Sequence, residues 1–506
     1  MRFRIVARCC ALVSGVVSLS MLFPAIWSAI DEGADFTAFM FSITLGLTAS
    51  YAFFRLADSP DAAKGDIGIR EAVAVVTLSW ITAAAIGALP YYASGLLSSY
   101  TDAFFESMSG FTTTGATVLS DVELAPRGLL FWRAMTHWLG GMGIIVLSLA
   151  ILPFLGMSGM ELYKAEYPGP TPDKMTPRMR VTALWLWGVY VLLTASETAF
   201  LSREMGFFDA LTHSFSTIAT GGFSTKNASL AAFGSPYVEW VVSLFMFLSG
   251  LNFSVHFMIL LNFKRFSAKL FANSFKETAR RIACDEECRF YIKVVSVSAA
   301  AVFASLLLSR PTRFWSAAHS LRASVFQVLS IVSTTGFVAE THFIWSPFVR
   351  VLLIVLMFVG ACAGSTGGGI KMARAIGLIR LFRSETVALL HPRAVLATHA
   401  RERLSNGRKS SGAALTSIAA FFAAYILIFF TSSLLVSIFD LDIASVFSLV
   451  ISSISNVGPA LGFMPPSGGY AGLPGGVKWI LGFCMLSGRL ELYPALLLLS
   501  PATWRK

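Results

Sequence analysis

Long apolar segments separated by short polar connectors dominate the chain. They lie near residues 9–30, 37–54, 71–93, 127–154, 180–201, 237–262, 290–309, 347–379, 412–438 and 475–500. A helix needs about 20 apolar residues to cross the hydrocarbon core of a bilayer. The pattern therefore predicts about ten membrane-spanning helices and an all-α integral membrane protein.

Four shorter amphipathic segments lie between successive apolar segments. In the first unit, 71–93 is the predicted outer span, 101–112 the short helix, 113–117 a loop and 127–154 the inner span. The short helices are too brief to cross a membrane. Because non-helical backbone is tolerated at membrane depth only inside protein or beside a watery cavity, we predict four re-entrant loops around one shared cavity.

The four loops have related sequences at similar spacing along the chain. They read SGFTTTGAT around Gly115, STIATGGFS around Gly221, SIVSTTGFV around Gly336 and SISNVGPAL around Gly458. We therefore predict two N-terminal spans followed by four copies of one span–loop–span unit in a pseudo-fourfold arrangement. The predicted divisions are 1–62 for the N-terminal pair, then 63–165, 166–275, 276–395 (with a broken inner span) and 396–506 for the repeats.

Composition and charge agree with a membrane location. Hydrophobic residues make up 55% of the chain and charged residues 13%, and the formal net charge is +11. Lysine and arginine cluster at 2–8, 55–70, 164–180, 264–293, 371–409 and 505–506. With ten spans these clusters share one face, so the positive-inside rule places both termini in the cytoplasm. The basic charge is thus a topology signal with anionic lipid as its partner, and nucleic-acid binding is not predicted.

The Thr-Thr-Gly loops have the chemistry of an ion filter. Rings of backbone carbonyls replace the hydration shell of a potassium ion in potassium channels. To aim successive carbonyls at one axis, a chain needs backbone angles that glycine adopts at little cost. A single Thr-Thr-Gly is weak evidence, but four in the same context favour a filter with one quarter from each repeat.

Several longer motifs resemble one known superfamily. They read WLGGMGIIVLSLAILPFLGMSGMELYKAEYPGP (138–170), GGFSTKNASL (221–230), SGLNFSVHF (249–257), GACAGSTGGGIKMAR (360–374), NVGPALG (456–462) and LSGRLELYP (486–494). On these motifs, which cover almost the whole chain, the protein resembles the Trk/Ktr/HKT superfamily of potassium transporters. The two extra N-terminal spans are those of the TrkH type.

The resemblance implies potassium uptake, with potassium as the substrate and no cofactor. Its filter glycines would be Gly115, Gly221, Gly336 and Gly458, and the carbonyls before them would bind the ion. The predicted filter residues are Thr113, Thr114, Gly115, Ala219, Thr220, Gly221, Thr334, Thr335, Gly336, Asn456, Val457 and Gly458. In plant relatives, serine at the first filter glycine goes with sodium preference, so Gly115 favours potassium. The fourth loop departs most, because it lacks the threonine pair and has Ala460 where TrkH types usually carry glycine.

A glycine-rich stretch interrupts the segment at 347–379. The residues concerned are Gly364, Ser365, Thr366, Gly367, Gly368, Gly369 and Lys371. Adjacent glycines disfavour a continuous helix, and the resemblance implies an intramembrane gate loop beneath the filter. Close helix packing through small residues is the alternative. A phosphate-binding loop is not predicted, because Gly-Lys-Ser/Thr is absent.

Charged residues inside the predicted membrane segments are the remaining candidates. Arg489 lies deep in the last span, where an ionisable side chain is costly and is usually functional or paired. The resemblance places it in the pore beside the glycine-rich stretch; a pair with Glu491 is the alternative. Glu106 and Arg322 are interpreted as packing or pairing residues. Cys284 and Cys288 flank Asp285-Glu286-Glu287 without a zinc-site spacing, so no metal site is predicted there.

The resemblance also implies partners and a location. TrkH relatives sit in the bacterial cytoplasmic (inner) membrane, form homodimers and work with a ring of cytoplasmic nucleotide-binding regulatory subunits. A proton- or sodium-coupled potassium symporter remains an alternative, since broken helices and buried charges serve both mechanisms. An enzyme acting on lipid-linked substrates is not predicted, because the seven histidines are scattered and no carboxylate pair has catalytic spacing.

Overall fold

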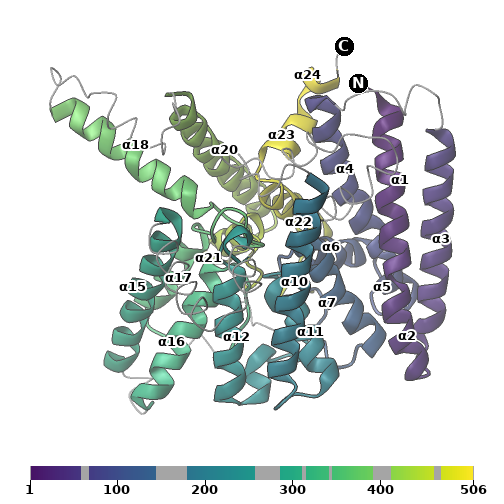
Figure 1. Cartoon of the computed structure of the whole chain (residues 1–506), viewed down its shortest axis with the longest axis horizontal. Helices are drawn as coiled ribbons and strands as arrows, with labels where there is room; N and C mark the ends of the chain where they lie inside the picture. Colours follow the sequence, from purple (N-terminus) through teal and green to yellow (C-terminus); the bar gives the residue numbers. More distant parts are fainter. Residues whose placement is uncertain are drawn as a thin grey trace, which may run out of the picture.

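A computed structural model describes residues 2–57, 68–143, 179–256, 285–309, 315–340, 345–390, 412–460 and 469–504. Within these ranges every regular element is a helix, apart from one isolated bridge between Val359 and Ile370. The helices surround a central region that holds several short non-helical segments (Figure 1). The prediction of an all-α protein is confirmed.

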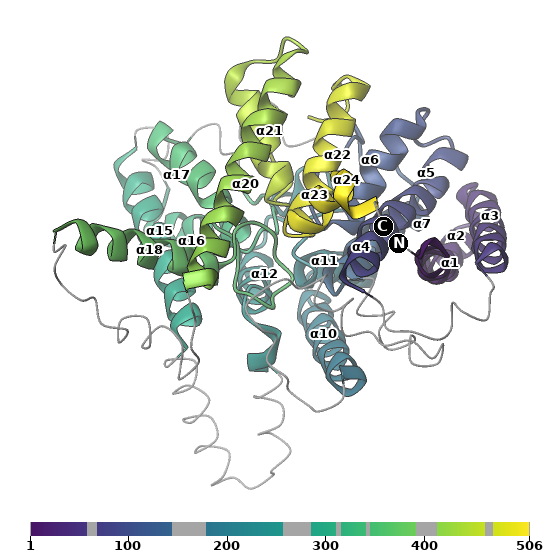
Figure 2. The ribbon, with the colours of Figure 1, turned by 90° about the horizontal axis from the view of Figure 1, so that it is seen from above.

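The two N-terminal spans stand at one edge of the molecule (Figure 2). They are α1 (Phe3–Ser20) continued by α2 (Leu22–Ile30), and α3 (Asp35–Leu56). Small polar residues allow them to pack closely: the Ser50 hydroxyl donates to the Ala11 carbonyl at 2.6 Å, and Gly46 faces Ser18. α1 also contacts α4 (Ile69–Gly87), which joins the pair to the first repeat.

The outer helices of the repeats are long and apolar. They are α4 with its extension α5 (Leu89–Ala93), α10 (Met179–Leu201), α15 (Glu286–Leu308) and α20 (Gly412–Ser437). Together with the N-terminal pair, they give six stretches in the described part of the chain that are long and apolar enough to cross a membrane. These six correspond to predicted spans 9–30, 37–54, 71–93, 180–201, 290–309 and 412–438.

The four short helices are present where the pattern places them. They are α6 (Tyr100–Phe111), α11 (Phe207–Ile218), α16 (Ala317–Val332) and α21 (Ile443–Ile454). Side chains fix the start of two of them, since Ser316 accepts from the His319 amide and Asp442 from the Ala444 and Ser445 amides. Such caps satisfy amides that have no partner within the helix. Each short helix ends at the centre of the molecule.

The inner helices differ from the prediction. They are α7 (Arg127–Gly141), α12 (Pro236–Ser249), α17 (Pro347–Met357) and α22 (Gly475–Arg489), and each begins at or just after a proline. Continuous spans were predicted at 127–154, 237–262 and 475–500, with a break only in 347–379. This is wrong, because all four helices end within 11 to 15 residues. Residues 144–154 and 257–262 lie outside the described residues.

Close backbone contact explains why inner helices end where they do. A Cβ atom built on Gly140 would overlap the carbonyl of Phe111, and one on Gly488 would overlap the carbonyl of Ile454. The ends of α7 and α22 thus lie directly on the ends of short helices α6 and α21. After α22 the chain turns through Glu491 and Leu492, both with positive φ, into α23 (Tyr493–Leu499). Glycine at the contact permits this approach.

The repeats form a closed ring. Each inner helix packs on the short helix of the next repeat: α7 on α11, α12 on α16, α17 on α21, and α22 back on α6. Ion pairs lie at two of these contacts, Arg322 Nε to Glu239 Oε2 at 2.8 Å and Lys478 Nζ to Asp102 Oδ1 at 2.6 Å. The predicted pairing of Arg322 and the pseudo-fourfold arrangement are confirmed.

Both ends of the described chain lie at the same end of the molecule (Figure 1). The ring of Phe3 stacks on that of Trp504 in α24 (Pro501–Trp504), with centroids 6.0 Å apart. The helix α18 (Met372–Leu390) also extends toward this end and projects away from the ring. The basic connectors at 164–178, 264–284 and 391–409 lie outside the described residues.

Candidate functional site

The four loops that follow the short helices share one backbone conformation. We call residues 112–115, 219–222, 333–336 and 455–458 the filter segments. In each, the second residue has a positive φ, at Thr113 (53°), Thr220 (55°), Thr334 (61°) and Asn456 (54°). The fourth residue is a glycine with positive φ, at Gly115 (82°), Gly222 (79°), Gly336 (80°) and Gly458 (96°).

Hydrogen bonds fix the filter segments to their short helices in the same way. The amides of Thr114, Gly221, Thr335 and Val457 donate to the carbonyls of Ser109, Ser216, Ser330 and Ser452, at 2.8 to 2.9 Å. Each bond caps the end of a short helix, where carbonyls have no partner within the helix. The third residue of each segment is therefore in an equivalent position.

This equivalence corrects the predicted alignment of the second loop by one residue. Gly222, not Gly221, corresponds to Gly115, because it has the left-handed backbone and lines the same cavity. Gly221 occupies the position of Thr114. A serine stands six positions before each left-handed glycine, at Ser109, Ser216, Ser330 and Ser452, and this spacing identifies Gly222 among the two adjacent glycines.

The filter segments form a ring in which each glycine faces a carbonyl of its neighbour. A Cβ atom on Gly115 would overlap the carbonyl oxygen of Gly221, one on Gly222 that of Thr335, one on Gly336 that of Val457, and one on Gly458 that of Thr114. All four contacts run in the same direction around the ring. Only glycine fits, for reasons of both space and backbone angle.

In the second quarter, a histidine ring fills the space that the side chain of the third filter residue fills in the other quarters. Threonine or valine stands at the third position of the other three segments, whereas Gly221 has no side chain. The imidazole of His137, fully buried on α7, lies where a Cβ atom of residue 221 would be. It stacks on Phe223 with centroids 4.0 Å apart. Sequence reasoning missed this exchange, because the two positions are far apart along the chain.

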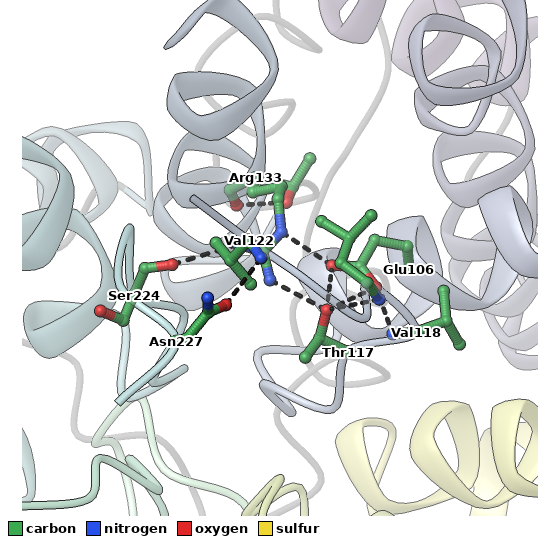
Figure 3. A network of polar contacts seen from close by, with 9 residues as sticks. Glu106, Thr117, Val118, Val122, Arg133, Ser224 and Asn227 are labelled. Atoms are coloured by element: carbon green, nitrogen blue, oxygen red, sulfur yellow. Dashed lines mark hydrogen bonds and ion pairs between the residues drawn. The ribbon is translucent and has the colours of Figure 1, made fainter. Parts of the chain in front are cut away.

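A buried ion pair fixes the chain beyond the first two filter segments (Figure 3). Glu106 accepts hydrogen bonds from Arg133 Nε at 2.8 Å, from the Val118 amide at 2.9 Å and from the Thr117 hydroxyl at 3.0 Å. The predicted pairing of Glu106 is thus confirmed.

The same arginine reaches the second quarter. Arg133 Nη1 donates to the Ser224 carbonyl at 3.2 Å, and its guanidinium lies 4.1 Å from the centroid of the Phe223 ring. A buried ion pair holds its geometry when each partner has further hydrogen bonds. Arg133 was not singled out in the sequence, where it is one basic residue in an apolar segment.

The four left-handed glycines line one cavity of about 80 Å³. Residues that follow the filter segments complete its wall, among them Thr117, Ser224 and Val338. Tyr470 also lines it and donates its hydroxyl to the Gly458 carbonyl at 2.7 Å. The cavity gives the four quarters a common mouth.

On the opposite side, the ring is covered by the predicted glycine-rich stretch. Between the end of α17 at Met357 and the start of α18 at Met372, residues 358–371 form a non-helical loop, here called the glycine-rich loop. Gly368 donates its amide to Thr334 Oγ1 at 2.8 Å. The Thr366 hydroxyl donates to the Ile218 carbonyl at 3.1 Å. A Cβ atom on Gly368 would also meet Asn456, so the loop contacts three quarters.

Arg489 joins this loop to the first quarter. Its guanidinium donates to the Thr366 carbonyl at 2.6 Å, to Thr113 Oγ1 at 3.2 Å and to the Gly140 and Gly141 carbonyls at the end of α7. The structure thus places Arg489 beside the loop and below the ring. Glu491, the alternative partner, is paired with Arg374 of α18.

The glycine-rich loop, Arg489 and Lys371 enclose a small cavity. It measures about 40 Å³ and is lined by Trp80, Glu491, Lys371, Arg489 and the glycines of the loop. The Lys371 ammonium donates back to the Gly367 carbonyl. Two cationic side chains, Arg489 and Lys371, therefore line the space below the ring together with the Glu491 carboxylate.

We predict that the side chain at position 221 and His137 compensate for each other. Gly221→Thr should destabilise the protein by about 1–3 kcal/mol because the new side chain overlaps the imidazole. Gly221→Thr with His137→Ala should recover much of this loss, since the removed ring leaves the space. The measurement is thermal unfolding of the purified protein in detergent.

Gly222→Ala provides the matched control. It meets the Thr335 carbonyl and has φ +79°, so His137→Ala should not rescue it. Equal rescue of both glycine variants by His137→Ala would contradict the assigned register.

Comparisons with known proteins agree with this architecture. The sequence model of the TrkH family, described as a cation transport protein, matches residues 40–506. The chain is 38% identical to the Trk system potassium uptake protein TrkH of Salmonella typhimurium and 37% identical to that of Halomonas elongata, in each case over 100% of both chains. This chain superimposes on the crystal structure of the potassium transporter TrkH from Vibrio parahaemolyticus with a TM-score of 0.85 and 33% sequence identity, over 100% of both chains. The chain therefore belongs to the TrkH family of cation transport proteins, which confirms the inferred resemblance and the prediction of a transport protein.

Proposed function

We propose that this multi-pass membrane protein takes up potassium through the ring of filter segments. The observation that carries the proposal is the ring itself, in which four left-handed glycines each face a carbonyl of the neighbouring quarter. A dehydrated potassium ion needs such a set of inward-facing oxygens. The relatives named as potassium uptake proteins support the same ion.

The ion ligands in this proposal are backbone carbonyls of the second and third residues of each filter segment. With the corrected register they come from Thr113, Thr114, Thr220, Gly221, Thr334, Thr335, Asn456 and Val457. Ala219, included in the predicted set, precedes them as the equivalent of Thr112. The amide of the third residue of each segment donates a hydrogen bond to a serine carbonyl, and these bonds hold the carbonyls of the segments in place.

The gate in this proposal is the glycine-rich loop together with Arg489. Gly364, Ser365, Thr366, Gly367, Gly368, Gly369 and Lys371 would form the mobile part. For ions to pass, Thr366 must move away from the Ile218 carbonyl and from Arg489. A hydrogen bond to a charged group is worth about 1.5–3 kcal/mol, so the contacts of Arg489 favour the closed position.

We place the protein in the bacterial inner membrane with both termini in the cytoplasm, because Phe3 and Trp504 meet at one end and the basic residues Arg4 and Arg8 of α1 follow Phe3 there. The family resemblance supports a homodimer and a nucleotide-binding regulatory ring at the cytoplasmic face. Opening of the glycine-rich loop would then respond to that ring.

Proton-coupled symport is the second candidate. Glu197, near the end of α10, is a carboxylic acid with no exposed surface. Buried carboxylic acids within membrane helices commonly carry protons in transporters. If coupling operates here, Glu197→Gln would abolish proton-driven uptake and leave potassium flux down its own gradient intact.

Flux into liposomes tests the proposal. Potassium and sodium uptake would be measured with purified protein, with and without a proton gradient. Potassium flux down its own gradient that is indifferent to pH supports the channel-like filter, whereas flux that requires the proton gradient supports symport. Equal sodium and potassium flux would refute the selective filter.

We predict that Gly115→Ser raises sodium permeation relative to potassium. At φ +82° a serine side chain meets the Gly221 carbonyl, so the ring must deform and its oxygens no longer match potassium. The measurement is the ratio of sodium to potassium uptake. Ser120→Ala, at an exposed position beyond the segment, is the control, and an unchanged ratio in Gly115→Ser would argue against the filter assignment.

We also predict that Arg489→Ala raises basal potassium flux by about tenfold or more, because it frees Thr366 and removes the charge below the ring. A deletion within 364–369 should act in the same direction. Arg489→Lys keeps the charge but not the planar set of donors, so its flux should lie between the two. Lower flux in Arg489→Ala at matched protein amount would count against this gate.

A further inference from the structure

Three consecutive acidic residues begin α15, and each has a different partner. Asp285 caps the helix by accepting from the Glu287 amide at 2.9 Å. Glu286 pairs with Arg380 of α18 and is half exposed. Glu287 turns inward to the glycine-rich loop. The three residues therefore have distinct surroundings despite their adjacency in the sequence.

Glu287 binds both ends of the segment that covers the filter. Its Oε1 accepts from the Ala363 amide at 2.6 Å and from the Ala373 amide at 3.0 Å. Ala363 directly precedes Gly364, and Ala373 lies in the first turn of α18. One carboxylate oxygen thus connects the residue before Gly364 with the first turn of α18, on either side of Thr366 and Gly368, which contact Ile218 and the filter residue Thr334.

The contact with α18 uses a general property of helix ends. Amides in the first turn of a helix have no partner within the helix, and negative charge is favoured there by the helix dipole. Glu287 supplies that charge from another helix. Because α18 continues the loop, its start cannot leave α15 unless the Ala373 amide finds a new acceptor.

We infer that Glu287 is a positioning residue that holds the glycine-rich loop in its closed position beneath the filter. The inference rests on the proposed function of that loop as the gate. A displacement of the start of α15 would therefore reach the gate. It would take the Glu287 oxygen away from the Ala363 and Ala373 amides at the same time.

Other contacts of the loop do not replace this one. Gly360 and Ile370 bond to each other across the base of the loop, with the Gly360 amide donating to the Ile370 carbonyl at 2.9 Å. The Cys362 amide donates to the Gly250 carbonyl at 3.0 Å, which attaches the loop to the end of α12. These bonds fix the base and one side. Within the described part of the chain, the Glu287 carboxylate joins the loop to α15 through a charged group.

The native Cys362 offers a readout independent of ion flux. It lies in the loop one position before Ala363 and has no exposed surface. A loop released from Glu287 should expose this thiol to a water-soluble maleimide. Labelling of Cys362 would be followed by peptide mass spectrometry in the full-length purified protein, alongside potassium flux into liposomes.

We predict that Glu287→Ala raises the labelling rate of Cys362 and the basal potassium flux, each by about tenfold. Glu287→Gln retains an acceptor oxygen without the charge, so its effects should be smaller. Glu286→Ala removes the neighbouring, half-exposed acid and should leave both rates at the native level. The sodium-to-potassium ratio should stay native in every variant, because the filter segments are not touched.

The outcomes separate this inference from the proposed gate. Faster Cys362 labelling without higher flux would support Glu287 as the holding residue and refute the loop as the gate. Native labelling in a Glu287→Ala protein that unfolds at the native temperature would overturn the inference. If Glu287→Ala fails to fold, Glu287→Gln decides in the same way, with native labelling again overturning it.

Discussion

The structure depends on the ring of contacts between glycines and carbonyls at its centre. Each filter segment leaves no room for a Cβ atom on its last residue, and in each the amide of the third residue donates to a serine carbonyl. Backbone amides and carbonyls deep in the membrane must find hydrogen-bond partners within the protein, since lipid tails offer none. The short helices therefore end at the ring, and the inner helices end against them at Gly140 and Gly488. The broken helices follow from the ring.

The same constraint explains the cover on the ring. A helix passing below the filter would present side chains, whereas Gly367 and Gly368 approach the backbone and side chains of the third and fourth segments directly. Because the helix is interrupted within 347–379, the loop can make this close approach to the filter segments through its glycines. Its polar backbone then needs partners, which Arg489 and Glu287 supply from opposite sides. Two charged side chains thus add to the contacts that the loop makes through its own residues, such as Thr366 and Gly368.

Much of this arrangement could be predicted from the sequence. Apolar runs of sufficient length give the outer spans, and four Thr- and Gly-containing loops give the repeat. The ends of the inner helices could not be predicted, because the apolar residues continue past Gly141 and Ser249 although the helices end there. The sequence prediction assigns Gly221 as the filter glycine, and the left-handed backbone of Gly222 together with the hydrogen bond from Gly221 to Ser216 moves this register by one residue. The partners of Glu106, Glu287 and Arg489 lie in distant parts of the chain, where periodicity carries no information.

A single chain allows each quarter of the ring to differ, and the structure uses this freedom. In the second quarter, the ring of His137 fills the space that a side chain at Gly221 would take. In the fourth quarter, the side-chain amide of Asn456 donates to Thr114 Oγ1 at 3.0 Å and to the Met485 carbonyl at 2.9 Å. Among the described residues, the cover comes from the third repeat, and Arg489, which donates to it, comes from the fourth. Four arginines at this depth would repel one another and would each need carbonyl acceptors. One loop and one Arg489 can cover a fourfold ring because the repeats are covalently joined and free to diverge.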